Sequence, residues 1–320
     1  MKKKKVVIGS RGSRLAIWQA EWVKARLLHI APDLEVEIKK IKTTGDKILD
    51  VPLAKVGGKG LFVKEIEEAM LRGEVDLAVH SMKDVPTMLP QGLHLGAVCS
   101  REDPRDAFIS RKKGEEFTIR EFSEIPEGAV IGTSSLRRSC QLLHMRPDLK
   151  ILQLRGNVDT RFRKLDEGQF DAIILATAGV KRLGWEERIT ERISPELILP
   201  AIGQGAIGIE CRMDDGFINE LLSPLNHRET SLSVTAERAF LKRLEGGCQV
   251  PIAAYARVVE EEGRELLTID GLVGSVDGKV IIRDSRKGPA EDAAAIGDAL
   301  ARDLLQRGAR AILDEVYGSN

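Results

Sequence analysis

The chain has 320 residues, 42% of them hydrophobic, and its 49 basic and 49 acidic side chains cancel to a net charge of zero. A domain typically takes about 150 residues, so this length predicts two or three domains. Zero net charge excludes a global field that would draw the protein to nucleic acid or to a membrane. The apolar runs are too short for a signal peptide or a membrane span, so we expect a soluble, cytoplasmic protein.

The first predicted unit alternates apolar strands with amphipathic helices, a pattern typical of parallel sheets with crossover helices. One helix, starting near Ser13, repeats apolar residues at helical spacing. In chain order we predict a strand at 5–9, this helix with Ala16, Ala20, Val23 and Leu27 on one face, a strand at 35–41, a helix carrying Phe62, Ile66, Ala69 and Met70, and strands at 75–79 and 93–98.

A second unit begins near Asp106 and repeats the alternation. It contains a strand within 128–135, a helix through Leu142 and Leu143, a strand at 150–154, another helix and a buried strand at 171–176. Its opening, "AVIGTSSLRRS", echoes "VVIGSRGSRLA" in the first unit, although so short an echo can arise by chance. A Ser/Thr-rich turn before a helix offers backbone N–H groups and a positive dipole end to an anion.

The pattern changes after residue 212. A helix from about 231 to 244 ends at the C-cap signal Gly246-Gly247, and three strand-like runs at 251–260, 265–275 and 279–285 precede a helical C-terminus. The fold class is therefore α/β, with two doubly wound domains and a smaller α+β C-terminal domain. We predict the boundaries as 1–104 with 201–225, then 105–200, then 226–320.

Cys248 lies in "EGGCQVP", between a glycine pair and a Val-Pro step, at the entrance to the third domain. Cys99 and Cys211, by contrast, lie in apolar runs typical of buried thiols. The four cysteines form no CxxC pair and the five histidines are scattered, which argues against disulfides and against a metal site. We therefore expect free thiols and no bound metal.

The segment "VDLAVHSMKDVP" leaves a buried strand and enters polar residues. In open α/β sheets ligands bind at the carboxyl ends of the strands, so Ser81, Lys83 and Asp84 are candidates for a site. The alternative is that Asp84 only forms the turn before Val-Pro, and this segment alone favours the turn by about two to one. His80 fits a packed histidine equally well.

Basic side chains follow several predicted strands and could converge on one ligand. They are Arg11, Lys55, Lys59, Arg137, Arg138, Arg155, Arg161, Arg163 and Arg182. Arginine pairs with both oxygens of a carboxylate, and a sheltered contact contributes about 1.5 to 3 kcal/mol. The alternative is a solvated basic face, which would account for about half of them. A polycarboxylate ligand fits better than nucleic acid, because aromatic residues make up only 4% of the chain.

Nine segments in order from Gly9 to Ala254 resemble the porphobilinogen deaminase family, also called hydroxymethylbilane synthases. They are "GSRGSRLAxxQ", "TTGD", "GGKGLFVKE", "AVHSMKDVP", "GTSSLRR", "LRGNVDTR", "ATAGVKRLG", "IGQGAIGIE" and "EGGCQVPIAA". The resemblance implies an enzyme that joins four porphobilinogen molecules head to tail with loss of ammonia, giving hydroxymethylbilane for tetrapyrrole synthesis. It implies two domains folded like type II periplasmic binding proteins, a third domain, and a monomer.

The same resemblance implies a dipyrromethane cofactor joined to Cys248 by a thioether, and a catalytic role for Asp84. By residue-by-residue matching it implies cofactor contacts from Asp46, Ser81, Lys83, Thr133, Ser134, Ser135, Arg137 and Arg138. It implies substrate contacts from Arg11, Ser13, Lys55, Lys59, Arg155, Arg161 and Arg182.

Two other functions use the same features. A solute-binding module would share the two α/β domains and the anion site but would need neither Asp84 nor Cys248. A thiol enzyme would use Cys248 as a turnover nucleophile, yet no partner histidine is evident. The intact mass of the purified protein separates all three, because only the deaminase carries a two-pyrrole adduct.

Overall fold

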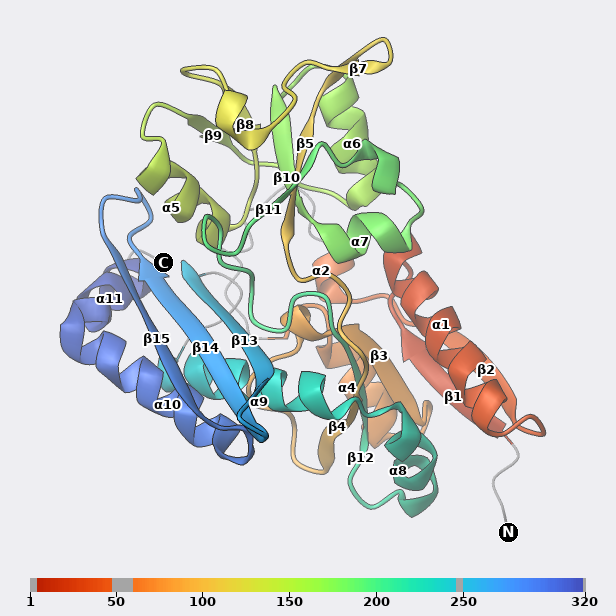
Figure 1. The fold of residues 1–320 in the computed structure, drawn as a ribbon. Helices are drawn as coiled ribbons and strands as arrows, with labels where there is room; N and C mark the ends of the chain where they lie inside the picture. Colours follow the sequence, from red (N-terminus) through yellow and green to blue (C-terminus); the bar gives the residue numbers. More distant parts are fainter. Residues whose placement is uncertain (1–4, 48–59, 246–249, 319–320) are drawn as a thin grey trace. The chain divides into compact units, whose positions relative to one another are not determined.

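The computed structural model describes residues 5–47, 60–245 and 250–318 (Figure 1). Residue contacts divide the chain into two compact units. The first comprises Met1–Glu102 and Ala206–Ser231, and the second comprises Asp103–Gly205 and Leu232–Asn320. The three-domain division expected from the sequence stays a prediction.

The first unit contains a five-stranded sheet with the order β2-β1-β3-β12-β4. Its strands are β1 (Lys5–Ser10), β2 (Glu35–Lys40), β3 (Leu77–Ser81), β4 (Leu93–Val98) and β12 (Ile207–Arg212). Strands β1, β2 and β3 run parallel, as predicted, whereas β12 runs antiparallel to β3 and β4. The sheet is mixed because β12, which comes much later in the chain, runs antiparallel to both of its neighbours.

Helices and 3-10 turns pack around the first sheet. The helical elements are α1 (Arg14–Ile30), α2 (Thr44–Lys47), α4 (Lys64–Leu71), α8 (Gly216–Leu222), and the 3-10 turns η1 (Met82–Asp84) and η4 (Ser223–Leu225). Ser13 caps α1, its Oγ accepting a hydrogen bond from the Ala16 N–H at 3.3 Å. The sequence predicted that Phe62 lies on a helix, but Phe62 precedes α4, whose N-cap is Val63.

The predicted apolar face of α1 is confirmed, with Ala20, Val23 and Leu27 buried.

The second unit contains a five-stranded sheet with the order β11-β5-β10-β8-β9. Its strands are β5 (Asp106–Ser110), β8 (Val130–Gly132), β9 (Lys150–Leu152), β10 (Ala172–Ala176) and β11 (Glu191–Ile193). Strands β8, β9, β10 and β11 run in one direction, and β5 runs antiparallel to its two neighbours, β10 and β11. Strands β1 and β8 hold corresponding places, and each leads to a serine-capped helix. The short sequence echo therefore reflects a repeated structural unit.

The helical elements around the second sheet are α5 (Leu136–Met145), α6 (Val158–Asp166), α7 (Thr177–Arg182), η2 (Phe122–Glu124) and η3 (Glu186–Arg188), and a small hairpin pairs β6 (Lys112–Lys113) with β7 (Glu116–Phe117). Helix α5 buries most of its first two turns, including both of its arginines. This burial determines what the arginines can bind.

The C-terminal part is an antiparallel sheet with helices packed on it, which confirms the predicted α+β pattern. Its elements are α9 (Arg228–Arg243), β13 (Ile252–Glu261), β14 (Arg264–Gly274), β15 (Ile281–Pro289), η5 (Ala290–Asp292), α10 (Ala293–Leu304), the π-helical η6 (Leu305–Ala309) and α11 (Arg310–Gly318). In Figure 1, α10 and α11 lie along one face of this sheet. A Cβ on Gly271 would lie 2.7 Å from the Phe240 ring, so glycine lets that aromatic side chain reach the strand.

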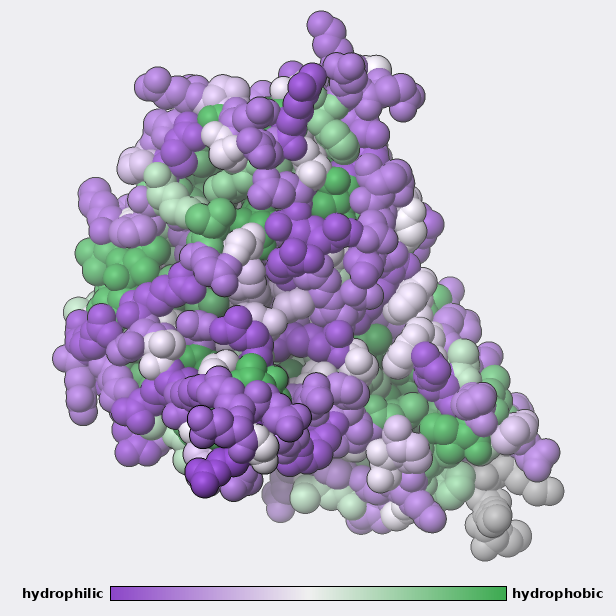
Figure 2. Space-filling model, viewed as in Figure 1, coloured by the Kyte–Doolittle hydropathy of each residue, from purple (hydrophilic) through white to green (hydrophobic). Residues whose placement is uncertain are grey.

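The face drawn in Figure 2 is largely hydrophilic, with apolar residues in small separate patches. None of the helices in the described residues has the length and apolar character that a bilayer crossing requires.

Candidate functional site

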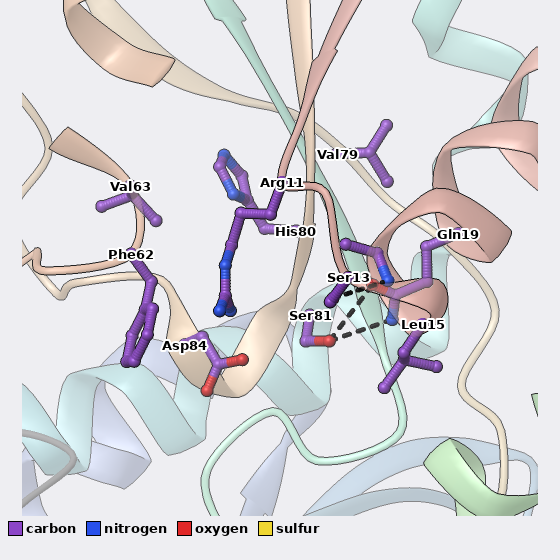
Figure 3. Close-up of a pocket in the computed structure, with 11 residues that line it drawn as sticks. Arg11, Ser13, Leu15, Gln19, Phe62, Val63, Val79, His80, Ser81 and Asp84 are labelled. Atoms are coloured by element: carbon purple, nitrogen blue, oxygen red, sulfur yellow. Dashed lines mark hydrogen bonds between the residues drawn. The ribbon is translucent and has the colours of Figure 1, made fainter. Parts of the chain in front are cut away.

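A pocket opens in the first unit at the carboxyl ends of the parallel strands β1 and β3 (Figure 3). Its lining residues are Arg11, Ser13, Leu15, Ala16, Gln19, Phe62, Val63, Val79, His80, Ser81 and Asp84. Parallel strands end at the same edge of a sheet, which is why the turns after β1 and β3 meet there. Four residues singled out from the sequence, Arg11, Ser13, Ser81 and Asp84, therefore share one pocket.

The pocket presents positive and hydrogen-bonding groups. The Arg11 guanidinium carbon lies 4.2 Å from the centroid of the Phe62 ring, a cation–π contact. Ser13 stands at the N-terminus of α1, where the helix dipole favours negative charge. These groups suit an anionic ligand such as a carboxylate.

Asp84 ends the 3-10 turn η1, immediately after β3. The Val85 N–H closes the turn by donating to the Met82 carbonyl at 3.2 Å. Figure 3 shows the Asp84 carboxylate and the Arg11 guanidinium pointing into the same space. Asp84 therefore both ends the turn and lines the pocket, because the turn points its carboxylate into the pocket. Lys83 lies beside it in η1 and is half-buried.

Gln19 is a pocket residue to which the sequence assigned no role. Its side chain is buried on α1, and its Nε2 donates to Ser81 Oγ at 2.9 Å. The bond links the helix to the end of β3 and orients the Ser81 hydroxyl. In the sequence, the signal for Gln19 was its position as a polar residue on the otherwise apolar face of α1.

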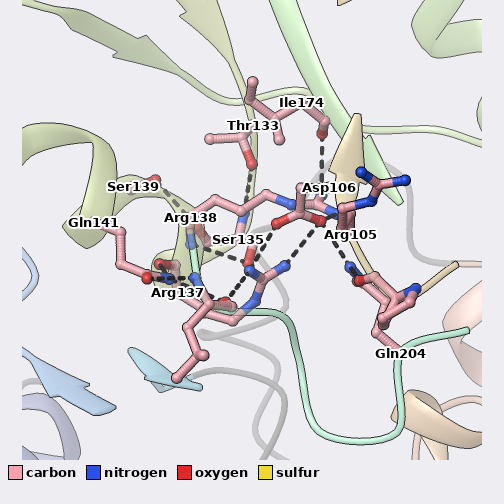
Figure 4. Close-up of polar contacts among 12 residues, drawn as sticks. Arg105, Asp106, Thr133, Ser135, Arg137, Arg138, Ser139, Gln141, Ile174 and Gln204 are labelled. Atoms are coloured by element: carbon pink, nitrogen blue, oxygen red, sulfur yellow. Dashed lines mark hydrogen bonds and ion pairs between the residues drawn. The ribbon is translucent and has the colours of Figure 1, made fainter. Parts of the chain in front are cut away.

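In the second unit, Asp106 is fully buried between two guanidiniums (Figure 4). Arg137 Nη1 donates to Asp106 Oδ2 at 2.7 Å, and Arg138 Nη2 donates to Asp106 Oδ1 at 2.6 Å. Burial raises the pKa of Asp106, but the two guanidiniums outweigh it and hold that pKa well below its usual range. Arg137 also donates to the Leu199 carbonyl at 2.8 Å. Both arginines are therefore buried parts of the fold, and both form ion pairs with Asp106.

This arrangement still leaves positive charge for an anion. Two guanidiniums face one carboxylate, so one unit of positive charge is not neutralised by Asp106. Within the described part of the chain, the buried Arg138 Nε has no hydrogen-bond partner. A buried unpaired donor is costly unless a ligand or water satisfies it.

The Thr133–Ser135 turn precedes these arginines, and its hydroxyls are engaged within the turn. Thr133 Oγ1 accepts from the Ser135 N–H at 3.2 Å, and Ser134 Oγ donates to the Leu154 carbonyl at 2.9 Å. Ser135 Oγ caps α5 by accepting from the Arg138 N–H at 3.4 Å. The turn is therefore stiffened at the N-terminus of a helix, where backbone N–H groups favour an anion.

Three further arginines of the second unit are half-buried: Arg155, Arg161 and Arg182. Arg161 Nε donates to the Gly156 carbonyl at 2.8 Å, and Arg182 Nη2 donates to the Gly205 carbonyl at 2.7 Å. A carbonyl orients a guanidinium without cancelling its charge, so these contacts leave both arginines cationic. Asp46 belongs to α2, whereas Lys55, Lys59, the Gly246-Gly247 cap and Cys248 lie outside the described residues.

The Asp106 cluster predicts a large effect on stability. Asp106→Asn is expected to lower the free energy of unfolding by about 3 to 5 kcal/mol, because two buried guanidiniums lose their counter-charge. Chemical denaturation followed by circular dichroism measures the loss. The control is Asp166→Asn, which breaks the exposed Arg188–Asp166 pair and should cost far less. Equal losses in the two variants would contradict the prediction.

Behind the pocket, α4 buries Glu67 close to His80 and Glu210. Burial, and then repulsion from Glu210, raise the pKa of Glu67 to about 7, while His80 opposes the shift. The folded protein therefore holds a proton that the unfolded chain releases at its usual lower pKa.

This proton predicts a dependence of stability on pH. The contribution of Glu67 is fully present below its ordinary pKa of 4.5 and is lost as pH rises through about 7. The loss amounts to at most about 3 kcal/mol. We expect Glu67→Gln to lose less stability than the unaltered protein between pH 5 and pH 8, measured by chemical denaturation. Glu68 is exposed and makes the smallest contribution to the shift, so Glu68→Gln should keep most of the pH dependence. A Glu67→Gln curve with the same pH dependence as the unaltered protein would refute the assignment.

Comparison with known proteins gives two matching family models. The model described as "Porphobilinogen deaminase, dipyromethane cofactor binding domain" matches residues 6–220. The model described as "Porphobilinogen deaminase, C-terminal domain" matches residues 231–306.

Curated relatives match over nearly their whole length. The porphobilinogen deaminase of Pelobacter propionicus is 57% identical over 310 residues, 97% of this chain and 96% of the relative. That of Carboxydothermus hydrogenoformans is 55% identical over 314 residues, 98% of each chain. Among solved structures, the periplasmic VFT2 domain of Bordetella pertussis BvgS is 15% identical, with a TM-score of 0.38 over 68% of this chain and 84% of that domain. So low a TM-score supports no conclusion about fold.

Proposed function

The chain belongs to the porphobilinogen deaminase family, and on that premise we propose that Asp84 is its catalytic residue and that Cys248 carries its dipyrromethane cofactor. The enzyme condenses four porphobilinogen molecules head to tail into hydroxymethylbilane. The observation that supports the proposal for Asp84 is the pocket in which its carboxylate and the Arg11 guanidinium face the same space (Figure 3).

Each condensation breaks the C–N bond of an aminomethylpyrrole whose amine is protonated, breaks a C–H bond at a ring carbon, and forms one C–C bond. Ammonia and one proton are released. Positive charge develops on the pyrrole as ammonia leaves, and a carboxylate beside the ring N–H stabilises that charge. The same carboxylate accepts the ring proton when aromaticity is restored. Asp84 performs both tasks, while Arg11 holds a substrate carboxylate.

A dipyrromethane carries carboxylates and pyrrole N–H groups, and the described residues fit both. The turn Thr133–Ser135, the uncancelled charge of Arg137 and Arg138 and the unpaired Arg138 Nε suit its carboxylates. We assign Ser81, Lys83 and Asp46 to the cofactor contacts as well, and Asp84 accepts hydrogen bonds from the pyrrole N–H groups. When bound, the cofactor supplies the ring carbon to which the first substrate is joined.

Arg155, Arg161 and Arg182 bind the carboxylates of the incoming substrate and of the growing chain, together with Arg11, Ser13, Lys55 and Lys59. Their proposed role gives a testable result. In Arg155→Leu and Arg182→Leu, elongation should stall, and enzyme-bound intermediates should accumulate in intact-mass spectra. The control is Arg163→Leu, because Arg163 is exposed and faces Glu167. Normal product release by the two variants would overturn their assignment to substrate.

We further propose a monomeric, cytoplasmic enzyme of three domains that binds no nucleic acid. The zero net charge and the low aromatic content support the absence of nucleic-acid binding. Size-exclusion chromatography with light scattering tests the oligomeric state.

A further inference from the structure

Residues 199–205 form a segment of the second unit that contacts two of the arginines assigned to ligand carboxylates; we call this segment the strap. At its first residue, the Leu199 carbonyl accepts a hydrogen bond from Arg137 Nη1 at 2.8 Å. At its last residue, the Gly205 carbonyl accepts a hydrogen bond from Arg182 Nη2 at 2.7 Å. The strap therefore orients one arginine at each of its ends.

Within the strap, the buried Gln204 contacts the counter-ion of the buried arginines. Its Nε2 donates to Asp106 Oδ1 at 2.8 Å and to the Pro104 carbonyl at 2.7 Å. The same Asp106 oxygen accepts from Arg138 Nη2 at 2.6 Å, and Figure 4 shows Gln204 and Arg138 approaching Asp106 from different sides. Gln204 therefore fixes the strap against the second sheet, where β5 begins at Asp106.

A buried carboxylate ties the strap to the C-terminal part of the same unit. Glu237 lies on α9 and is fully buried. Its Oε2 accepts from the Gly203 N–H at 2.6 Å, and its Oε1 accepts from the Ala256 N–H of β13 at 2.9 Å. The Ile202 side chain of the strap is buried in the same hydrophobic core as Phe240 of α9. One carboxylate therefore joins the strap, α9 and β13.

The two hydrogen bonds of Glu237 give the strap a fixed geometry. A carboxylate in a core carries a desolvation cost, which charge-assisted hydrogen bonds to backbone N–H groups offset. Gly203 and Gly205 have φ values of 69° and 91°, a left-handed backbone that glycine adopts readily. The strap therefore turns sharply between the N–H held by Glu237 and the carbonyl that holds Arg182.

We propose that Glu237 is a positioning residue for elongation, because it holds the strap and, through the Gly205 carbonyl, the guanidinium of Arg182. Helix α9 leads along the chain to Cys248, the proposed attachment point of the growing pyrrole chain. Carboxylates of that chain pair with Arg182 only if the arginine keeps its place relative to the C-terminal part. Glu237 touches no substrate and takes part in no bond change. The inference rests on the proposed roles of Arg182 and Cys248.

The direct test measures hydrogen exchange of the strap in the holoenzyme. Glu237→Gln keeps the size of the side chain but removes the charged acceptor, so the Gly203 amide in a peptide covering the strap should exchange about 10-fold faster. Glu260→Gln is the control, because Glu260 is exposed on β13. Unchanged exchange of the strap in Glu237→Gln would overturn the proposal.

The second readout separates positioning from a loss of structure. A misplaced Arg182 binds substrate carboxylates less well, so in Glu237→Gln the KM for porphobilinogen should rise about 10-fold, while kcat at saturation stays within about two-fold. Destabilisation alone reduces the amount of active enzyme, which lowers kcat and leaves KM unchanged. Leu313→Ala is the control for that effect, because it opens a cavity in the same C-terminal core. An unchanged KM in Glu237→Gln, with or without a lower kcat, would overturn the proposal.

Glu237→Asp provides a second variant for both measurements. It keeps the negative charge, but its side chain is one methylene shorter and cannot reach both the Gly203 and the Ala256 N–H groups. We expect faster exchange of the strap and a raised KM in this variant as well. A Glu237→Asp variant with the exchange and the KM of the unaltered enzyme would contradict the proposal.

Arg182 variants separate this inference from the proposed function. If Glu237 acts through Arg182, then adding Glu237→Gln to Arg182→Lys should raise KM by less than about two-fold, and a full 10-fold rise would overturn the proposal. Normal product release by Arg182→Leu would overturn the substrate role of Arg182 and, with it, this inference. Stalled elongation in Arg182→Leu combined with an unchanged KM in Glu237→Gln would overturn the positioning role alone.

Discussion

Asp84→Ala is expected to retain the fold and lose nearly all turnover. Asp84 lies half-exposed in a 3-10 turn, so its removal leaves no buried cavity. The variant loses the group that stabilises the developing positive charge and accepts the ring proton. Acid–base catalysis contributes about 10²- to 10⁴-fold and a preorganised charge about 10²- to 10³-fold, so the rate should fall by at least about 10³-fold. Asp84→Glu keeps a carboxylate at a displaced position and should retain a trace.

The measurement is the rate of ammonia release, with circular dichroism as the check on folding. Asp214→Ala is the control, because Asp214 is an exposed aspartate of the same unit and does not line the pocket. A folded Asp84→Ala variant with a rate near that of the unaltered enzyme would remove Asp84 from the mechanism.

Cys248→Ala is expected to abolish both the covalent adduct and turnover. The intact mass of the unaltered protein should exceed the sequence mass by two linked pyrrole units, and the variant should show the sequence mass alone. A thioether does not exchange with thiols as a disulfide does, so treatment with a reductant should leave the adduct in place. Without the primer, the first condensation has no acceptor.

The other cysteines provide the controls. Burial raises the pKa of Cys140 to about 12 and that of Cys211 to about 11. A thiol that stays protonated is a poor nucleophile, so neither should carry the adduct. Cys140→Ala should therefore keep the added mass. An active enzyme of unmodified mass, or an adduct that survives in Cys248→Ala, would exclude the thioether at Cys248.

The local elements of this protein were predictable because they depend on residues close together in the chain. Apolar periodicity predicted the buried face of α1. The serine-rich turns expected before two helices are where Ser13 caps α1 and Ser135 caps α5. The family motifs alone identified Asp84 and Cys248 as candidates. Periodicity could not predict that β5 and β12 run antiparallel to their neighbours, because strand direction depends on where the chain re-enters a sheet.

The buried charge clusters were decided by the tertiary structure alone. Asp106 meets Arg137 from 31 positions away, and His80 meets Glu210 from 130 positions away. A single sequence carries no local signal for such pairs, because sheet order and helix packing bring their side chains together. The sequence by itself determined the family, the elements and the candidate residues. The tertiary structure decided that Arg137 and Arg138 form buried ion pairs with Asp106, and that His80 and Glu210 are buried together, because sheet order and helix packing bring charges that are distant in the chain close together.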